Sequence, residues 1–485
     1  MTFNSFEFLF FAPLIFIIYW LIPKQKFRIQ NVLLLAASYF FYGFWDWRFL
    51  GLIIFSSIVD FCIGIGLGNT TDKTKRKILL WTSIITNIGL LGVFKYFDFF
   101  SESFSQLASN IGFNTSPFLL NVLLPVGISF YTFQTLSYTI DVYRKKMEPS
   151  KDVIAFFTFV AFFPQLVAGP IERAKQLLPQ FLKERSFSYE KAKLGLRQIF
   201  WGIFKKAVIA DGLAEYVNVI FANYSEMSAL TLVFGIVLFT FQLYCDFSGY
   251  SNIAIGTAKL FGFDLTQNFA FPFFARDIAE FWRKWHITLN TWFRDYIFYE
   301  LGGSRSSKMK IARNTIIIFV ISGIWHGANW TYIITGLLHG LYFLPFILMR
   351  KHRRYTKPIP NKQLLPKGKE LLAMLKVFGI FSFSMVFFRS ETINDAFSYL
   401  EGIVNLGNLY NGADWLKLEF FNTNTLYVFG SLLFLIVIEW YNRNSQFGLE
   451  KISNHVVVRW VLYLLMSLIM IQYFAAGSEF IYFQF

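Results

Sequence analysis

Unbroken apolar runs of helix length recur along the whole chain of 485 residues. An α-helix needs about 20 apolar residues to cross the hydrocarbon core of a bilayer. The clearest runs lie at residues 6–21, 31–44, 50–67, 78–97, 118–140, 228–245, 314–325, 331–348, 371–388, 425–440 and 457–475. Of these, the run 118–140 is broken by Pro125 and Gly127. A spanning β-barrel would instead alternate apolar and polar residues along each strand. The pattern predicts an all-α, polytopic integral membrane protein with roughly eleven spans.

The composition excludes a soluble or disordered chain. Only 15% of the residues are charged and 55% are hydrophobic, whereas a soluble domain carries about a quarter charged residues. No polar linker divides the sequence, so we expect one membrane-embedded domain over residues 1–485. Cys62 and Cys245 both lie in apolar runs and form neither a disulfide framework nor a zinc pattern. No metal site is therefore predicted.

Basic residues gather in alternate loops and set the expected orientation. The Lys and Arg residues number three in loop 23–28, one in 45–49, four in 69–77, none in 101–117, four in 144–151 and eight in 350–369. Basic loops stay in the cytosol and face anionic lipid. The rule predicts cytosolic loops 23–28, 69–77, 144–151 and 350–369 and an extracytoplasmic N-terminus. The net charge of +15 is then explained by basic residues in cytosolic loops, and nucleic-acid binding is not needed to explain it.

The middle of the chain is less regular. Residues 152–170 are apolar but end in a stretch with Pro164, Gly169 and Pro170, which predicts a broken or re-entrant segment buried in protein. Residues 189–208 and 276–300 mix basic and aromatic residues at helical spacing and predict interfacial helices. Polar residues at 246–251 interrupt one of the apolar runs.

His326 is the histidine whose surroundings most favour chemistry. It has an apolar run on each side, and Gly323 and Gly327 leave room for a substrate to approach. A desolvated imidazole stays neutral, so it can accept a proton as a general base for a hydroxyl. A structural histidine remains the alternative.

The other histidines favour structural interpretations. The residues around His286 suggest an interfacial anchor helix. His339 follows His326 by thirteen residues, so one continuous helix would place the two on different faces. An interhelical hydrogen bond is the favoured interpretation of His339. His352 and His455 lie in polar loops and are interpreted as solvated.

Five motifs occur in an order that is similar to a known family. They are Pro125–Gln134, Phe163–Ile171, Tyr244–Tyr250, Phe281–Ile287 and Gly323–Gly327. Together they resemble the bacterial membrane-bound O-acyltransferases, in the branch of the alginate O-acetyltransferase membrane subunit. The resemblance implies many helices around a central funnel. It maps the family histidine to His326 and the second functional position to His286.

The resemblance implies acyl transfer across the membrane. Cytosolic acetyl-CoA would donate the acetyl group, and His326 would act as a general base or as a transient acyl carrier. Arg283, Lys284 and Arg305 would attract the donor phosphates, although positive-inside topology explains them equally well. Further candidate substrate-binding residues are Trp285, Trp325, Asp246 and Ser248. Acetyl transfer from a thioester needs no metal or redox cofactor, so none is expected to be tightly bound.

The acetyl group would reach hydroxyls of an extracytoplasmic polysaccharide, such as alginate or another cell-surface glycan. Members of this family commonly pass it to a separate extracytoplasmic acetyltransferase partner. The resemblance therefore predicts a bacterial inner-membrane enzyme of polysaccharide O-acetylation. A transporter or flippase for a polysaccharide or lipid-linked sugar is the alternative, because many spans and broken helices suit it equally well. A third interpretation is a scaffold that only docks the partner.

Overall fold

The computed structural model describes residues 1, 3, 5–113, 115–350, 353–360, 363–418, 422–451, 455–473 and 480–481. These residues form helices and connecting segments, and the described ranges contain no β-strand. The prediction of an all-α fold is confirmed. The chain divides into two compact units, Met1–Lys193 with Thr257–Thr266, and Leu194–Gly256 with Gln267–Phe485. That the whole chain acts as one embedded domain stays a prediction.

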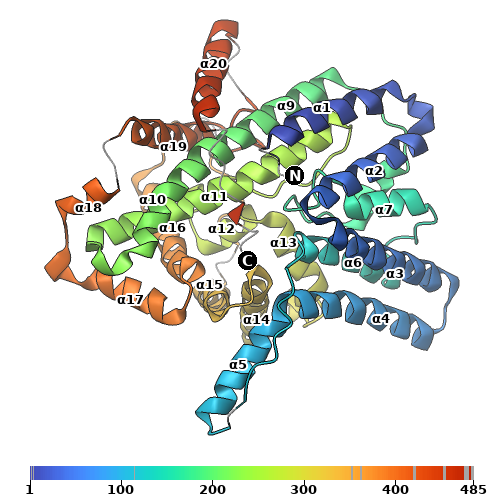
Figure 1. Cartoon of the computed structure of the whole chain (residues 1–485), viewed down its shortest axis with the longest axis horizontal. Coiled ribbons are helices and arrows are strands. Elements are labelled where there is room, and N and C mark those ends of the chain that lie inside the picture. Colours follow the sequence, from blue (N-terminus) through green and yellow to red (C-terminus); the bar gives the residue numbers. More distant parts are fainter. Residues whose placement is uncertain are drawn as a thin grey trace. The chain divides into compact units, whose positions relative to one another are not determined.

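The first unit is a set of packed helices near the N-terminus. Its elements are α1 (Phe6–Leu21), α2 (Phe27–Asp46), α3 (Leu50–Asn69), α4 (Lys73–Leu91), α5 (Phe97–Asn110), α6 (Ile128–Tyr143), α7 (Val153–Ala161) and α8 (Ala174–Phe181). Helix α3 packs against α4, α6 and α7, and these neighbours lie together in Figure 1. Asp60 of α3 is fully buried and accepts hydrogen bonds from Asn87 of α4 and Thr139 of α6, each at 2.7 Å. One buried carboxylate thus joins three helices.

One helix boundary in this unit differs from the predicted one. Helix α5 runs through most of the predicted loop 101–117, because its apolar residues recur at helical spacing. The predicted break of run 118–140 is confirmed, because the run becomes helical only at Ile128, after Pro125 and after Gly127 with its φ of +76°. The predicted break in 152–170 is also confirmed. Helix α7 ends at Ala161, and the following residues are buried without forming a helix.

The second unit carries the remaining helices. They are most of α9 (Tyr189–Ile203) and α11 (Ala229–Leu260), then α10 (Asp211–Ala222), α12 (Ile278–Lys284), α13 (Ile287–Phe293), α14 (Lys308–His326), α15 (Trp330–Leu348), α16 (Gly368–Arg389), α17 (Ile393–Val404), α18 (Gly412–Lys417), α19 (Thr423–Tyr441) and α20 (Val456–Tyr473). Helices α14 and α15 form a hairpin and lie side by side in Figure 1. Asn329 caps α15 by accepting a hydrogen bond from the backbone N–H of Thr331.

The apolar run 228–245 extends as a helix beyond its predicted end, because α11 continues through the polar residues 246–251 to Leu260. The polar side chains in this stretch are buried and bonded. Asp246 forms an ion pair of 2.8 Å with Lys206, and the Ser248 hydroxyl donates to the Tyr244 carbonyl at 2.5 Å. Polar groups that find partners inside the protein do not end a helix.

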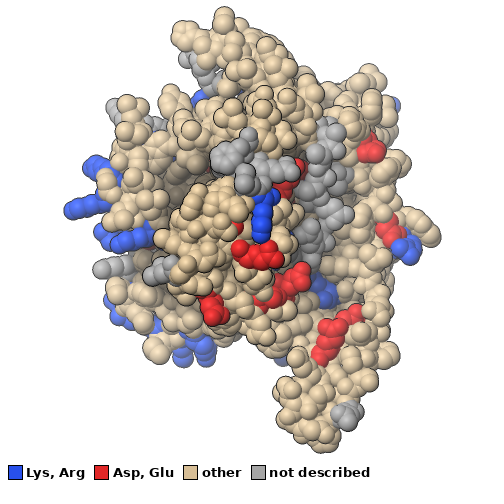
Figure 2. All heavy atoms as spheres, turned by 60° about the vertical axis from the view of Figure 1, so that its left-hand side comes forward, with Lys and Arg blue, Asp and Glu red and all other residues tan. Residues whose placement is uncertain are grey.

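Among the described residues, seven helical stretches are long and apolar enough to cross a membrane. This number is below the roughly eleven predicted spans for four reasons. Helices α1 and α6 have only 16 residues each. Helices α2 and α3 follow one another as one stretch, and α14 begins with Lys308, Lys310 and Arg313. Large apolar side chains are exposed on α1 and along α20. Most of the face in Figure 2 likewise carries no charge, as contact with lipid requires.

Candidate functional site

A cavity opens inside the second unit, among α11, α12, α14, α15 and α16. Its lining residues are Leu243, Trp282, Trp285, Phe319, Ser322, Gly323, His326, Tyr332, Thr335, Gly336, His339, Phe381, Met385 and Phe388. The walls are mainly apolar and aromatic, and they carry two imidazoles. Such a lining is typical of small-molecule sites, in which a few polar groups fix the orientation of a ligand.

Close packing of the α14–α15 hairpin shapes one wall of this cavity. A Cβ at Gly323 would lie 2.3 Å from the carbonyl oxygen of Tyr332, and one at Gly336 would lie 2.2 Å from that of Phe319. Only glycine permits this approach of the two backbones, as at many interfaces between membrane helices. The same glycines leave space beside the imidazoles.

His326 is the last residue of α14 and lines the cavity. Its ring is half-buried and packs edge-on against Trp325 and Phe388, with ring centroids 5.1 and 5.4 Å apart. The helix end and the two aromatic rings therefore fix the imidazole beside open space. This placement agrees with the surroundings that the sequence predicts for it.

His339 lines the same cavity from the middle of α15. The sequence favoured an interhelical hydrogen bond, but His339 makes no hydrogen bond with any residue in the described ranges. Its ring instead stacks on Phe381 at 5.5 Å and meets Trp282 edge-on at 4.8 Å. His326 and His339 share a cavity because the chain turns back between them, which a single continuous helix would not allow. The break at 327–329 was the sequence signal that could have revealed this.

His286 lies outside the cavity lining, in an aromatic cage. It is 1% exposed, and its ring packs against Phe247 at 4.7 Å and Trp325 at 5.7 Å. Neither ring nitrogen has a hydrogen-bond partner among the described residues. The backbone of His286 has φ +43°, a left-handed conformation that a residue with a side chain adopts at a cost. Trp325 therefore touches both His286 and His326.

The other predicted substrate-binding residues fall in different places. Trp285 lines the cavity, whereas Arg283 and Arg305 are exposed on α12 and on the short helix Gly303–Arg305. Ser248 lines a second, more polar cavity. Asp246 accepts a hydrogen bond of 2.8 Å from the backbone N–H of Ile481, besides its ion pair with Lys206. The structure thus brings only some of the predicted site residues together.

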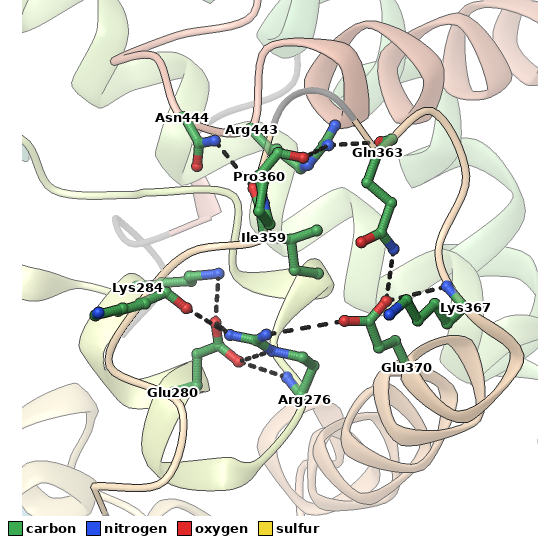
Figure 3. A network of polar contacts seen from close by, with 11 residues as sticks. Arg276, Glu280, Lys284, Ile359, Pro360, Gln363, Lys367, Glu370, Arg443 and Asn444 are labelled. Atoms are coloured by element: carbon green, nitrogen blue, oxygen red, sulfur yellow. Dashed lines mark hydrogen bonds and ion pairs between the residues drawn. The ribbon is translucent and has the colours of Figure 1, made fainter.

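Glu280 of α12 is the centre of a group of ion pairs shown in Figure 3. Its carboxylate pairs with Arg276 and with Lys284, each at 3.0 Å, and Arg276 also lies 4.0 Å from Glu370. Burial alone would raise the pKa of Glu280, but hydrogen bonds from Arg276 and the charge of Lys284 hold that pKa below its ordinary value. Lys284 therefore neutralises Glu280, and of the Arg283–Lys284 pair only Arg283 is exposed.

The described part of the basic loop 350–369 packs onto the same region. Arg283 donates a hydrogen bond of 2.8 Å to the Tyr355 carbonyl. In Figure 3, Arg443 donates to the Pro360 carbonyl at 2.5 Å, and Asn444 donates to the Ile359 carbonyl at 3.0 Å. His352 lies outside the described residues, whereas His455 is exposed. The hydrogen bond from Arg283 holds the loop beside α12. The same helix contains Trp282, which lines the cavity.

Comparison with known proteins identifies the family. The profile of the membrane-bound O-acyltransferase family matches residues 150–387. A probable alginate O-acetylase of Azotobacter vinelandii is 36% identical over 411 residues, which cover 84% of this chain and 79% of the relative. This chain belongs to the membrane-bound O-acyltransferase family. The matched residues include every residue that lines the cavity except Phe388, which lies one position beyond the match.

Other relatives of this membrane-bound O-acyltransferase carry related activities in their names. A probable alginate O-acetylase of Pseudomonas aeruginosa is 37% identical, covering 84% of this chain and 75% of the relative. A peptidoglycan O-acetyltransferase of Helicobacter pylori is 34% identical, covering 84% of this chain and 81% of the relative. The predicted class is therefore confirmed, and the protein is a multi-pass membrane O-acyltransferase. This membership disfavours the transporter and scaffold interpretations.

Proposed function

We propose that this enzyme takes an acetyl group from cytosolic acetyl-CoA and delivers it toward hydroxyls of an extracytoplasmic polysaccharide. The observation that carries the proposal is the position of His326, fixed at a helix end beside a cavity lined mainly by aromatic residues. The names of the relatives support a cell-surface glycan as the acceptor. A separate extracytoplasmic acetyltransferase would receive the group and complete its transfer. The enzyme would reside in the inner membrane of a bacterium.

The proposed chemistry needs one proton acceptor. The neutral imidazole of His326 takes the proton of an acceptor hydroxyl as the oxygen attacks the thioester carbonyl. The C–O bond forms, the C–S bond breaks, and the proton passes from His326 to the departing thiolate. His286 would act indirectly, because Trp325 connects its ring to that of His326. Exposed Arg283 would attract the donor phosphates at the surface.

Thioester consumption by the purified protein tests this proposal. We expect the enzyme in lipid nanodiscs to release coenzyme A from acetyl-CoA and to acetylate an added oligosaccharide or the partner. Release is measured with a thiol reagent, and the ester is detected by mass spectrometry. Transport of an intact glycan without any coenzyme A release would contradict the proposal and restore the transporter interpretation.

Cysteine labelling tests the proposed orientation. In a variant lacking Cys62 and Cys245, Thr356→Cys places a thiol on the exposed part of loop 350–369, and Ser116→Cys places one at an exposed position after α5. A membrane-impermeant maleimide applied to intact cells should label Ser116→Cys strongly. Thr356→Cys should react only after permeabilisation, because the positive-inside rule places its loop in the cytosol. The reverse pattern would invert the orientation.

A further inference from the structure

His286 lies where two short helices meet, and its backbone is unusual. Helix α12 ends at Lys284 and α13 begins at Ile287. Between them His286 adopts a φ of +43°, the left-handed conformation that a residue with a side chain keeps only where surrounding contacts enforce it. Its two ring nitrogens make no hydrogen bond within the described residues. The direction of the ring is therefore set by this backbone and by the aromatic cage.

Asn268 holds the backbone that follows His286. It comes from the segment after α11 and is fully buried. Its backbone carbonyl accepts a hydrogen bond of 2.9 Å from the Ile287 N–H. Its side-chain Oδ1 accepts from the Thr288 hydroxyl at 2.9 Å and from the Thr288 N–H at 3.4 Å. Its Nδ2 donates to the Ser251 hydroxyl at 3.1 Å, which fixes the asparagine to α11.

Asn290 holds the backbone that precedes His286. From within α13, its Nδ2 donates to two carbonyl oxygens, that of Trp285 at 2.6 Å and that of Trp282 at 3.0 Å. The backbone N–H of Asn290 also donates to the His286 carbonyl at 3.1 Å. The peptide groups on both sides of His286 are thus fixed by two asparagines that come from different segments of the chain.

The ring of His286 connects this backbone to the reaction site. Its centroid lies 5.7 Å from that of Trp325, whose ring in turn lies 5.1 Å from that of His326. On its other sides the His286 ring meets Phe247 at 4.7 Å and Phe269 at 6.3 Å. Because protein interiors are close-packed, a change in the backbone at His286 displaces its ring and, with it, the ring of Trp325.

We propose that Asn268 and Asn290 are positioning residues for acyl transfer. Their amides maintain the left-handed backbone at His286, which holds its ring against Trp325 and so fixes the orientation of the His326 imidazole. This inference rests on the proposed function, in which His326 takes the proton of the acceptor. Asparagine suits the task because one amide supplies both a donor and an acceptor, and Asn268 uses both. A reacting group must be held within about 0.5 Å of its productive geometry, so contacts that fix it from a distance affect the rate.

A double-mutant cycle between Asn290 and His286 tests this role. Asn290→Asp has nearly the same shape, but its carboxylate would face the two carbonyl oxygens that the amide binds in the wild type. We expect the kcat for acetyl-CoA to fall about 10²-fold, the cost of a displacement of about 1 Å at a reacting group, while KM changes little. In the His286→Ala background, which has no ring to position, the same change should reduce kcat by less than about twofold.

Matched variants separate positioning from folding. Asn268→Ala removes the other side-chain contacts and should show the same dependence on His286, so it carries the test where Asn290→Asp does not fold. Asn290→Gln keeps the donor amide and should recover part of the rate. Asn442 is also buried and donates to the Ile438 carbonyl on α19, so any loss in Asn442→Asp should be the same with and without the His286 ring. Thermal unfolding in detergent measures the stability of each variant.

Two results would overturn the inference alone. One is a loss in Asn290→Asp or Asn268→Ala that is equal in both backgrounds, which would show that these asparagines act through stability or through another residue. The other is wild-type turnover by a folded Asn290→Asp or His286→Ala enzyme, which would show that the position of this ring does not matter. A folded wild-type enzyme that consumes no acetyl-CoA would instead contradict the proposed function itself.

Discussion

Replacing His326 with alanine should reduce acyl transfer by about 10²–10⁴-fold, the contribution of a general base. The imidazole is the proposed proton acceptor, and alanine leaves the acceptor hydroxyl with no base at the end of α14. The turnover number for acetyl-CoA, measured with purified protein in nanodiscs, gives the effect. Substrate binding should change less than turnover, because the ring acts on the reacting proton.

The control for this variant is His455→Ala, which changes an exposed histidine just before α20. It should keep wild-type turnover. Gel filtration and thermal unfolding in detergent should show that the His326→Ala protein is folded. A folded His326→Ala enzyme that turns over at the wild-type rate would remove His326 from the mechanism. Trapping an acetylated His326 would instead show an acyl carrier rather than a base.

Replacing Lys206 with methionine should destabilise the second unit by about 3–5 kcal/mol, the usual cost of breaking a buried ion pair. Lys206 lies 2.7 Å from Asp211 and 2.8 Å from Asp246, and its side chain is 4% exposed. Without the ammonium, the buried carboxylates of Asp211 and Asp246 both lose a cation that lies within 2.8 Å of them, in a medium of low dielectric constant. Equilibrium unfolding in mixed detergent micelles measures the change in free energy.

A lysine whose carboxylate partner is exposed provides the matched control for Lys206. Lys191 forms an ion pair of 2.8 Å with Asp264, whose side chain is 72% exposed, so Lys191→Met should cost no more than about 1 kcal/mol. Adding Asp246→Asn to Lys206→Met should restore part of the lost stability, because it removes one of the two negative charges that pair with Lys206 in the wild type. Equal stability of the Lys206→Met and wild-type proteins would show that the buried ion pairs do not hold these helices together.

The sequence alone determined the helical class, most helix positions and the importance of His326. Apolar runs define helices by their own local pattern, and α15 and α16 begin and end within three residues of the predicted runs 331–348 and 371–388. His326 could be singled out because an ionisable group between apolar runs is costly in a membrane wherever the chain goes. The helix breaks at Pro125 and after Ala161 follow from the local backbone preferences of proline and glycine, which do not depend on contacts with other segments.

The tertiary structure alone decided which polar residues share a site. His339 joins His326 because the hairpin closes on Gly323 and Gly336, whereas His286 is enclosed by Phe247 and Trp325. Nor could the sequence show that Asp246 belongs to a continuous helix, since its partner Lys206 comes from a distant segment. Local patterns report what one helix buries, but a cavity and a buried ion pair depend on which helices meet, and contacts between segments far apart in the chain fix that choice.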